Sequence, residues 1–276
     1  MSLVWFEGPL GTELMRRGAP ADAFLPEWNV THSEIVDAIH TEYADAGSNV
    51  FLANSFTLNP VASSRSSSMA SGSSIGIAAV SLAKRHGFTL ADVGPIGRDA
   101  DFPDERSLLT TMDWLGDADG VLLETLSDES AFDAIRWIRR ERTDWPIYVS
   151  FTFRRDAEGV LRTFRGLSSA DIAERANDAG ITALGVNCGL NVSIGDTVSI
   201  VRTLRERTKA PLIARPNAGT PTANDGLWVW PLDPMAFASG MRPLIEAGAT
   251  MLGGCCGTGP EHLHAMIAAA EDLLLS

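Results

Sequence analysis

Three cysteines are the residues of this chain whose type and placement point most directly to chemistry. Cys188 follows the apolar run 183–186, and the adjacent pair Cys255 and Cys256 follows the apolar run 250–252. A disulfide between adjacent cysteines is strained, so metal ligation or thiol chemistry fits them better. Three thiolates with one open position form the ligand set of a catalytic zinc ion. The alternative is that the cysteines only pack in the core, as free cysteines often do.

A zinc ion held by three thiolates favours one kind of reaction. Such an ion is a weak Lewis acid toward water or a carbonyl group, but it readily binds a further soft sulfur ligand. A thiol bound there loses its proton near neutral pH and keeps much of its nucleophilicity. Attack of that sulfur on an electrophilic methyl group then needs mainly alignment and exclusion of water. The cysteines therefore predict activation of a substrate thiol and disfavour a zinc hydrolase.

Two further features fit an amino-acid thiol as the substrate. The segment Glu7-Gly8-Pro9-Leu10-Gly11-Thr12-Glu13-Leu14 is a tight glycine turn that opens a helix, and its free N–H groups could hold a carboxylate. Glu124 follows the apolar run 120–123, where its carboxylate could accept an ammonium group. The five histidines compete poorly as metal ligands, because they are expected at the surface or at helix ends: His32, His40, His86, His262 and His264.

Short apolar runs alternate with helical patterns along the whole chain, which predicts repeated βα units. The eight expected strands are 3–6, 49–53, 89–93, 120–123, 146–151, 183–186, 211–214 and 250–252. Eight strands in 276 residues predict a (β/α)8 TIM barrel that forms a single domain over residues 1–276. The active site of such a barrel lies at the C-terminal ends of its strands, where all three cysteines are expected.

Apolar residues spaced three and four apart predict the helices between these strands. The expected helices are 33–46, 75–86, 129–142, 170–179, 194–207, 234–247 and 261–275. Ser33 and the pair Ser168–Ser169 are predicted caps, and glycines 47, 87, 180 and 248 are predicted to end four helices. The serine-rich stretch Ser63–Ser74 is interpreted as a solvated loop, with a lid over the barrel mouth as the alternative.

Composition restricts the classes of partner. The chain has 22 Lys and Arg against 35 Asp and Glu, a net charge of −13, which disfavours a nucleic-acid partner because such binding needs clustered cations. No window approaches the roughly 18 apolar residues of a membrane span, and the N-terminus lacks the pattern of a signal peptide. These features predict a cytoplasmic protein without a membrane partner.

Several segments together resemble one known family. They are Gly8-Pro9-Leu10-Gly11-Thr12-Glu13-Leu14, Leu123-Glu124-Thr125, Gly185-Val186-Asn187-Cys188, Pro216-Asn217-Ala218-Gly219 and Gly253-Gly254-Cys255-Cys256-Gly257-Thr258. The chain resembles, over nearly its whole length, the zinc-dependent homocysteine S-methyltransferases. This family includes betaine–homocysteine and S-methylmethionine–homocysteine methyltransferases and the homocysteine domain of cobalamin-dependent methionine synthase.

The resemblance implies roles for individual residues. Cys188, Cys255 and Cys256 are implied zinc ligands, and Asn217 is implied as an oxygen ligand that homocysteine displaces. Glu124 is implied to receive the amino group of homocysteine as the catalytic-site carboxylate. Further contacts with homocysteine are implied for Glu7, Gly8, Thr12 and Asn187. Glu7 stands where the family usually has aspartate.

The methyl donor is left open among several classes. Trp28, Trp228 and Trp230 could form a cation–π wall for an onium donor, with loop packing as the alternative. Thr57 stands where betaine enzymes carry tyrosine, which weakens betaine as the donor. S-methylmethionine, S-adenosylmethionine, another onium compound or a methyl-corrinoid on a separate carrier protein are the candidates. The alternatives to homocysteine methylation are transfer to another thiol or selenol and a non-catalytic barrel that binds zinc or thiols.

Overall fold

Eight parallel strands form the central sheet of the computed structural model, which describes residues 2–64, 69–95, 104–224 and 227–274. Their order is β1-β12-β9-β8-β5-β4-β3-β2. The bounds are β1 (Val4–Trp5), β2 (Val50–Leu52), β3 (Phe88–Val93), β4 (Gly120–Leu126), β5 (Ile147–Phe151), β8 (Ala183–Asn187), β9 (Leu212–Arg215) and β12 (Met251–Leu252). Glu7 N donates to Val50 O at 3.0 Å and so brings the first strand to the second. The expected TIM barrel is confirmed, with a strand at each of the eight expected runs.

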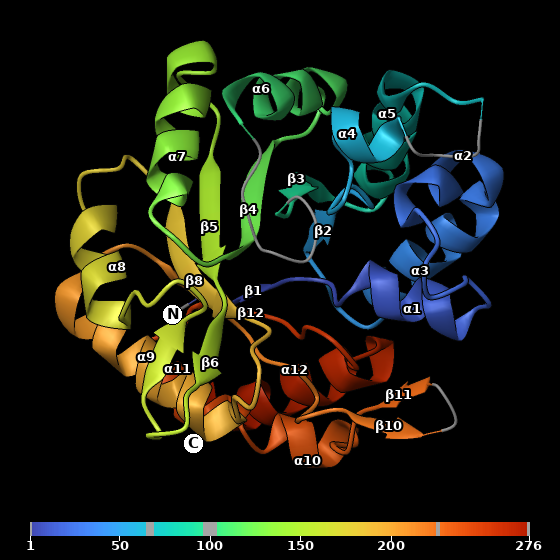
Figure 1. Ribbon diagram of the computed structural model, residues 1–276. Helices are drawn as coiled ribbons and strands as arrows, with labels where there is room; N and C mark the ends of the chain where they lie inside the picture. The colour runs from blue at the N-terminus through green and yellow to red at the C-terminus, as the bar shows by residue number, and fades with distance from the viewer. Residues whose placement is uncertain (1, 65–68, 96–103, 225–226, 275–276) are drawn as a thin grey trace.

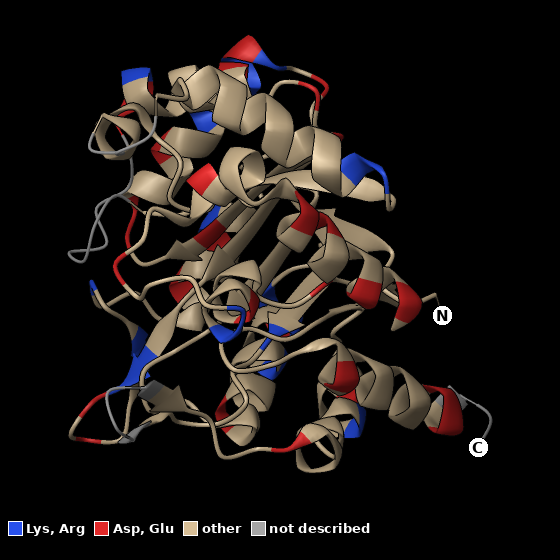
Figure 2. Cartoon of the chain, turned by 90° about the vertical axis from the view of Figure 1, so that its right-hand side faces the viewer, with Lys and Arg blue, Asp and Glu red and all other residues tan. Residues whose placement is uncertain are grey.

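Helices surround this sheet on its outer side (Figure 1). They are α1 (Leu10–Arg16), α2 (Trp28–Thr31), α3 (Ser33–Asp45), α4 (Pro60–Ser63), α5 (Gly72–Lys84), α6 (Glu105–Trp114), α7 (Ser130–Glu141), α8 (Ser169–Ala176), α9 (Ile194–Arg207), α10 (Pro234–Ala238), α11 (Met241–Glu246) and α12 (Pro260–Leu274), with a short 3-10 turn at Leu25–Glu27. Each expected helix is present, one of them divided in two, and Figure 2 shows acidic and basic residues interspersed along the chain.

Three features of the fold differ from the sequence-based expectation. Helix α6 was not predicted, and it provides the connection between β3 and β4. The expected helix 234–247 is split into α10 and α11 around Gly240, where an added Cβ would lie 2.5 Å from the side chain of Ile194. Two small antiparallel hairpins extend the loops after β5 and β9. They are β6 (Phe153–Arg155) with β7 (Leu161–Thr163), and β10 (Thr222–Asn224) with β11 (Leu227–Val229).

The expected helix ends are only partly right. Ser168 caps α8 in a reciprocal capping box with Asp171, whereas Ser33 is the first residue of α3 and His32 takes the cap position. The glycines at 47, 87, 180 and 248 all have positive φ, as expected at these joins. Ser71 caps α5 by accepting from Ser74 N, so the end of the serine-rich stretch belongs to a helix. The expectation for residues 65–68 concerns positions outside the described part of the chain.

The hydrophobic core has two layers. An inner cluster fills the barrel with Phe6, Val50, Leu52, Leu90, Leu122, Tyr148, Ala183, Ile213 and Met251, so that every strand contributes to it or is followed by a residue that does. A larger cluster packs the outward faces of the strands against the helices.

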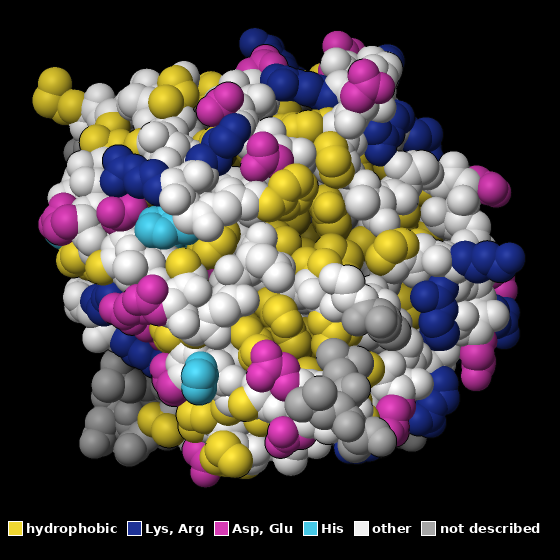
Figure 3. All heavy atoms as spheres, turned by 180° about the vertical axis from the view of Figure 1, so that it is seen from behind, with side chains coloured by type: hydrophobic (Ala, Val, Ile, Leu, Met, Phe, Trp, Pro, Cys, Tyr) yellow, Lys and Arg dark blue, Asp and Glu magenta, His cyan; other side chains and the backbone are white. Residues whose placement is uncertain are grey.

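On the face opposite to Figure 1, hydrophobic side chains gather toward the middle and charged side chains lie mostly nearer the rim (Figure 3). In the described residues, no helix has the length and apolar character needed to cross a membrane.

Gly185 provides a direct test of the barrel packing. A Cβ at this position of β8 would lie 2.4 Å from Ile213 Cβ and from Ile213 O in the neighbouring strand. We expect Gly185→Ala to lower the free energy of unfolding by about 1–3 kcal/mol or more, because the strand pair cannot separate without losing its hydrogen bonds. Urea denaturation measures this change. Gly195→Ala, in α9, is the control, because the nearest atom to an added Cβ at Gly195 is Ser193 Oγ, at 3.7 Å. An equal loss of stability in both variants would contradict the packing argument.

Candidate active site

A polar layer lies above the inner core, at the C-terminal ends of the strands. Residues two positions apart on a strand face the same side of the sheet. Asp92 therefore follows Leu90 into the barrel, Glu124 follows Leu122, and Arg215 follows Ile213; Ser150 follows Tyr148 in the same way. All four polar side chains are buried. The strand alternation that builds the core thus also aims charged groups at one end of the barrel.

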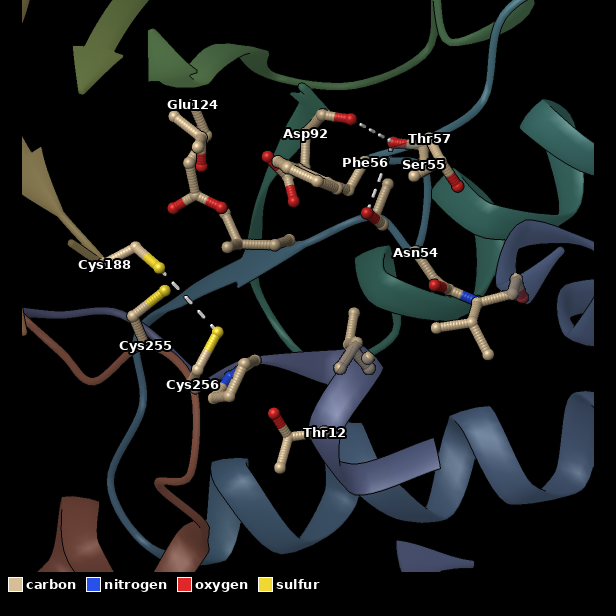
Figure 4. Close-up of a pocket in the computed structure, with 18 of the residues that line it drawn as sticks. Thr12, Asn54, Ser55, Phe56, Thr57, Asp92, Glu124, Cys188, Cys255 and Cys256 are labelled. Atoms are coloured by element: carbon tan, nitrogen blue, oxygen red, sulfur yellow. Dashed lines mark hydrogen bonds between the residues drawn. The ribbon is translucent and has the colours of Figure 1, made fainter. Parts of the chain in front are cut away.

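A cavity of about 380 Å³ opens at this end. Its polar or sulfur-bearing wall includes the three cysteines, Asp92, Glu124 and Arg215, while Met15, Leu25, Pro26 and Phe56 contribute an apolar wall. Figure 4 shows the cysteines on one side of this cavity, with Glu124 and Asp92 above them and Thr12 below, on the side of Cys256. Of the residues expected in the site, the lining contains Gly8, Thr12, Glu124, Cys188, Cys255 and Cys256.

The three cysteines converge as the strand order predicts. Their Sγ atoms all lie within 4.8 Å of one another, and those of Cys188 and Cys256 are 3.9 Å apart. Within the described part of the chain, this is the one cluster of histidine, cysteine and acidic residues that could hold a metal ion. Three soft sulfur donors at this separation suit zinc, and no histidine takes part.

Backbone hydrogen bonds fix the loops that carry the cysteines. Cys188 N donates to Arg215 O at 3.1 Å and Cys255 N donates to Pro216 O at 2.8 Å, so both loops are tied to the end of β9. Cys188 itself has a φ of 55°, in the left-handed region that side chains rarely adopt. This strained conformation is held by the surrounding bonds, as is common where a side chain is aimed at a site.

Mutual hydrogen bonding makes the three thiols unequal. Hydrogen bonds from Cys255 and then Cys256 hold the pKa of Cys188 well below its usual value. The contact with Cys188 raises the pKa of Cys255 to about 12 and raises the pKa of Cys256 as well. Ionisation of Cys188 therefore opposes ionisation of the other two thiols. Full ionisation of all three needs a cation, which is the behaviour of metal-ligating cysteines.

A buried ion pair crosses the barrel beside the cysteines. Arg215 Nη1 on β9 donates to Glu124 Oε1 on β4, and both side chains are almost fully buried. The guanidinium also lies 5.6 Å from the centre of the Phe6 ring, and its Nη2 reaches Glu7 O at 3.5 Å. Burial raises the pKa of Glu124 to about 7, against the attraction of Arg215. The carboxylate expected to meet an ammonium group thus already has a cationic partner.

Asp92 is a buried carboxyl group of a different kind. Its residue is 7% exposed, and its Oδ1 has no hydrogen-bond partner. Burial, followed by the nearby charge of Glu124, raises the pKa of Asp92 well above its usual value. The carbonyl oxygen of Asp92 accepts from Ser55 Oγ at 2.8 Å, which fixes the backbone at the end of β3. Asp92 therefore presents to the cavity an acidic group that holds its proton more tightly than usual.

Glu7 does not reach the cavity that it was expected to line. Its side chain is fully buried, with Oε2 2.8 Å from His40 Nδ1 and Oε1 accepting from Leu52 N. Both oxygens are therefore used inside the protein. His40 lies in the middle of α3 and is also fully buried, so the expectation of a surface or helix-end position is wrong for this histidine. His40 is buried because its Nδ1 pairs with Glu7 Oε2, and each side chain gives the other a hydrogen-bond partner inside the protein.

Asn187 and Asn217 stand behind the cavity wall. Asn187 is fully buried, and its Oδ1 accepts from Ser150 Oγ at 2.8 Å while its Nδ2 donates to Thr125 Oγ1 at 2.9 Å. These bonds hold the irregular end of β4, where Thr125 has a φ of 63° next to Glu124. Asn217 donates from Nδ2 to Gly189 O at 3.2 Å, and its buried Oδ1 has no partner. Asn187 Nδ2 also lies 3.9 Å from Cys255 Sγ, so Asn187 joins the end of β4 to the cysteine wall, whereas Asn217 keeps a free oxygen.

The expected turn after β1 contributes two cavity residues. Gly8 is required by Tyr43, whose hydroxyl oxygen would lie 2.2 Å from an added Cβ. Thr12 Oγ1 accepts from Gly257 N at 3.5 Å and so contacts the loop of the cysteine pair. Trp28 lies outside this cavity, stacked on His32 at 4.1 Å beside a separate surface hollow. Trp230 packs against Gly257, and Trp228 is 62% exposed, so these tryptophans do not line the cysteine cavity.

Asp92 and Arg215 are the two charged cavity residues that sequence reasoning missed. Each ends or nearly ends an apolar strand and stands two positions after an inward-facing leucine or isoleucine. This spacing was visible in the sequence, because a charged residue in phase with the core of a buried strand must lie in the barrel interior. An isolated charge in such a run is therefore a signal for the site.

Comparison with known proteins identifies related sequences along the whole chain. The family model described as Homocysteine S-methyltransferase matches residues 4–270. Homocysteine S-methyltransferase 3 of Arabidopsis thaliana is 24% identical over 324 aligned residues, which cover 96% of this chain and 89% of that protein. The methionine synthase of Mycobacterium tuberculosis is 23% identical and covers 97% of this chain, but the chain spans only 24% of that longer protein.

A solved structure supports the same architecture. The metallated form of the homocysteine methyltransferase MmuM from Escherichia coli superposes with a TM-score of 0.77 at 21% sequence identity. The superposition covers 97% of this chain and 96% of that chain. The two proteins therefore share the fold over their full compared length.

Removal of one partner tests the ion pair across the barrel. We expect Arg215→Met to lower the free energy of unfolding at pH 8 by about 3–5 kcal/mol, because it leaves Glu124 charged and buried without a partner. Replacing both residues, as Arg215→Met with Glu124→Leu, should recover most of this loss. Urea denaturation of the single and double variants measures the coupling. Equal stability of the two variants would show that the pair does not form.

The unpartnered Asp92 predicts a stability that depends on pH. Its pKa is higher in the folded than in the unfolded state, so the folded protein binds more protons and loses stability as pH rises above about 4. We expect Asp92→Asn to raise the free energy of unfolding at pH 8 by about 1–3 kcal/mol, with a smaller gain near pH 4. Exposed Asp45→Asn is the control for denaturation at both pH values. A loss of stability in Asp92→Asn at pH 8 would contradict the burial argument.

Proposed function

Because the chain belongs to the homocysteine S-methyltransferase family, we propose that it transfers a methyl group to the sulfur of homocysteine and forms methionine. The observation that carries this proposal is the convergence of Cys188, Cys255 and Cys256 on one wall of the cavity. A thiol substrate is the ligand that completes such a sulfur site. The size of the cavity, about 380 Å³, suits a small amino acid together with a small donor group.

We propose zinc as the metal of this site. Cys188, Cys255 and Cys256 would hold it, and Asn217 is a candidate fourth ligand because its buried Oδ1 has no other partner. When bound, zinc supplies a Lewis acid that keeps a substrate sulfur in the thiolate form at neutral pH. All three cysteines are free thiols, so the proposed site requires a reducing compartment such as the cytoplasm.

The protein's own residues prepare the displacement in which the sulfur–methyl bond forms. The bond between the methyl carbon and its donor breaks in the same step, and the electron pair of that bond leaves with the donor. Met15, Leu25 and Phe56 exclude water from the methyl group, which makes a charged donor more reactive. Gly8 and Thr12 line the cavity from the side of α1, and Figure 4 shows Thr12 at the opposite end of the view from Glu124. The side chains thus mainly align the two reactants.

We propose that the donor is a small onium compound such as S-methylmethionine or S-adenosylmethionine. The apolar wall of the cavity supports this choice, since it favours loss of charge from a sulfonium group. A methyl-corrinoid on a separate carrier protein is the second candidate, and the match to part of a methionine synthase favours it. A selenol could occupy the same site as the homocysteine thiol.

Loss of one cysteine tests the proposed chemistry. We expect Cys255→Ser to reduce bound zinc and to lower methionine formation from homocysteine by at least a hundredfold, because a hydroxyl is a poor zinc ligand. Zinc content and methionine formation are measured with each donor in turn, including a methyl-corrinoid. Ser199→Ala, at an exposed position of α9, is the matched control and should behave as the wild-type protein.

The wild-type protein provides the decisive outcome for this proposal. Zinc-loaded protein that binds homocysteine but gives no methionine with any donor would indicate a barrel that binds thiols without catalysis. Full activity of Cys255→Ser would contradict the proposed metal site. Turnover with a single donor class would identify both the reaction and its methyl source.

A further inference from the structure

The side chain of Asn187, the last residue of β8, uses its whole hydrogen-bonding capacity inside the protein. Its Oδ1 accepts from Ser150 Oγ at 2.8 Å and from Thr125 N at 3.2 Å. Its Nδ2 donates to Thr125 Oγ1 at 2.9 Å and to Cys255 Sγ at 3.9 Å. An asparagine amide has two donor hydrogens and an oxygen that accepts two bonds, so these contacts leave no polar group of Asn187 for a substrate.

The contact with Cys255 places positive charge beside one particular sulfur atom. The amide hydrogen of Asn187 faces this sulfur, and the charge of Arg215 acts on it as well. Both stabilise negative charge on Cys255, against the opposing effect of Cys188. A hydrogen bond to an ionised group is stronger than one between neutral groups, so the Asn187 contact gains strength when Cys255 is a thiolate.

Negative charge is the main obstacle to a further sulfur ligand at this wall. Three thiolates outweigh the charge of one divalent cation, and a substrate thiolate adds to the excess. A hydrogen bond from the protein spreads part of that charge away from the sulfur. Groups that lie behind metal ligands commonly tune a metal site in this way. The amide of Asn187 therefore stands where it can ease the entry of a fourth thiolate.

The same amide holds the irregular end of β4. Thr125 directly follows Glu124 and has a φ of 63°, a conformation that is costly for a residue with a side chain. Asn187 binds both the backbone N and the hydroxyl group of Thr125. One buried side chain thus ties the sulfur wall to the strand that carries Glu124, and a shift at one would be felt at the other.

We propose that Asn187 is a positioning residue of the methyl transfer, which holds the Cys255 sulfur and reduces its negative charge so that a substrate thiolate can join the metal. It acts through Cys255 and does not touch the substrate. The inference rests on the proposed function, because it assumes that the three cysteines bind zinc.

Cobalt(II) bound in place of zinc tests the sulfur contact by absorption. Asn187→Leu removes the donor and keeps a side chain of similar size. We expect its sulfur-to-cobalt charge-transfer band to move to longer wavelength at unchanged intensity, because a sulfur without the hydrogen bond gives up an electron more readily. Competition with a chelator should show zinc bound about 10- to 100-fold more weakly. The Kd of homocysteine, read from the cobalt spectrum, should also rise.

Ser150→Ala is the matched control, because it removes another partner of the same amide and leaves the contact with Cys255 in place. We expect it to keep the band position and the zinc affinity of the wild-type protein. Asn187→Ser, with a shorter polar side chain, removes the same sulfur contact and repeats the test should the leucine variant not fold.

The position of the band decides between a role at the sulfur and a role in folding alone. A band that stays in place or only loses intensity in the Asn187 variants, or that moves equally in Ser150→Ala, would overturn the inference and leave the proposed function intact. A wild-type protein whose cysteines bind neither cobalt nor zinc would overturn the proposed function and this inference together.

Discussion

Closure of the sheet into a barrel is the constraint on which the rest of this structure depends. Every second side chain of each strand must then point into a space shared by eight strands. Leu90, Leu122 and Ile213 fill that space with apolar atoms, and the next inward positions carry Asp92, Glu124 and Arg215. The charged groups have no route to bulk solvent on their own strands. All three line the cavity, but Glu124 and Arg215 pair across the barrel, whereas Asp92 Oδ1 has no hydrogen-bond partner.

The cysteines reach the same place by a different physical route. They follow the ends of β8 and β12, and backbone bonds to the end of β9 hold their loops in place. Glycines make this close approach possible, since a Cβ at Gly254 would lie 2.2 Å from Thr258 Oγ1. The left-handed conformation of Cys188 is part of the same arrangement. The sulfur cluster is thus held by the main chain, and its geometry does not depend on which charged side chains surround it.

The sequence was sufficient to predict the strands and the sulfur cluster, because both depend on local pattern and on the strand order of a barrel. It was insufficient where a long-range partner decides the outcome. Glu7 was expected to face the substrate, but His40 and Leu52 N occupy both of its oxygens. Asn187 was expected to contact the substrate, but its Nδ2 donates to Thr125 Oγ1 at the end of β4 and also lies 3.9 Å from Cys255 Sγ. Each of these partners is remote in the sequence, so no local periodicity indicates it.

Asp92 and Glu124 have different surroundings in the cavity. A buried carboxylate in contact with a guanidinium has its field largely cancelled at short range, whereas one without a partner keeps it. Burial raises the pKa of both groups, yet only Glu124 has a neighbouring cation that opposes the shift through direct contact. The cost of leaving Asp92 without a close partner falls on the folded protein as pH rises, because the buried group must then lose its proton without a cation in contact to stabilise the charge.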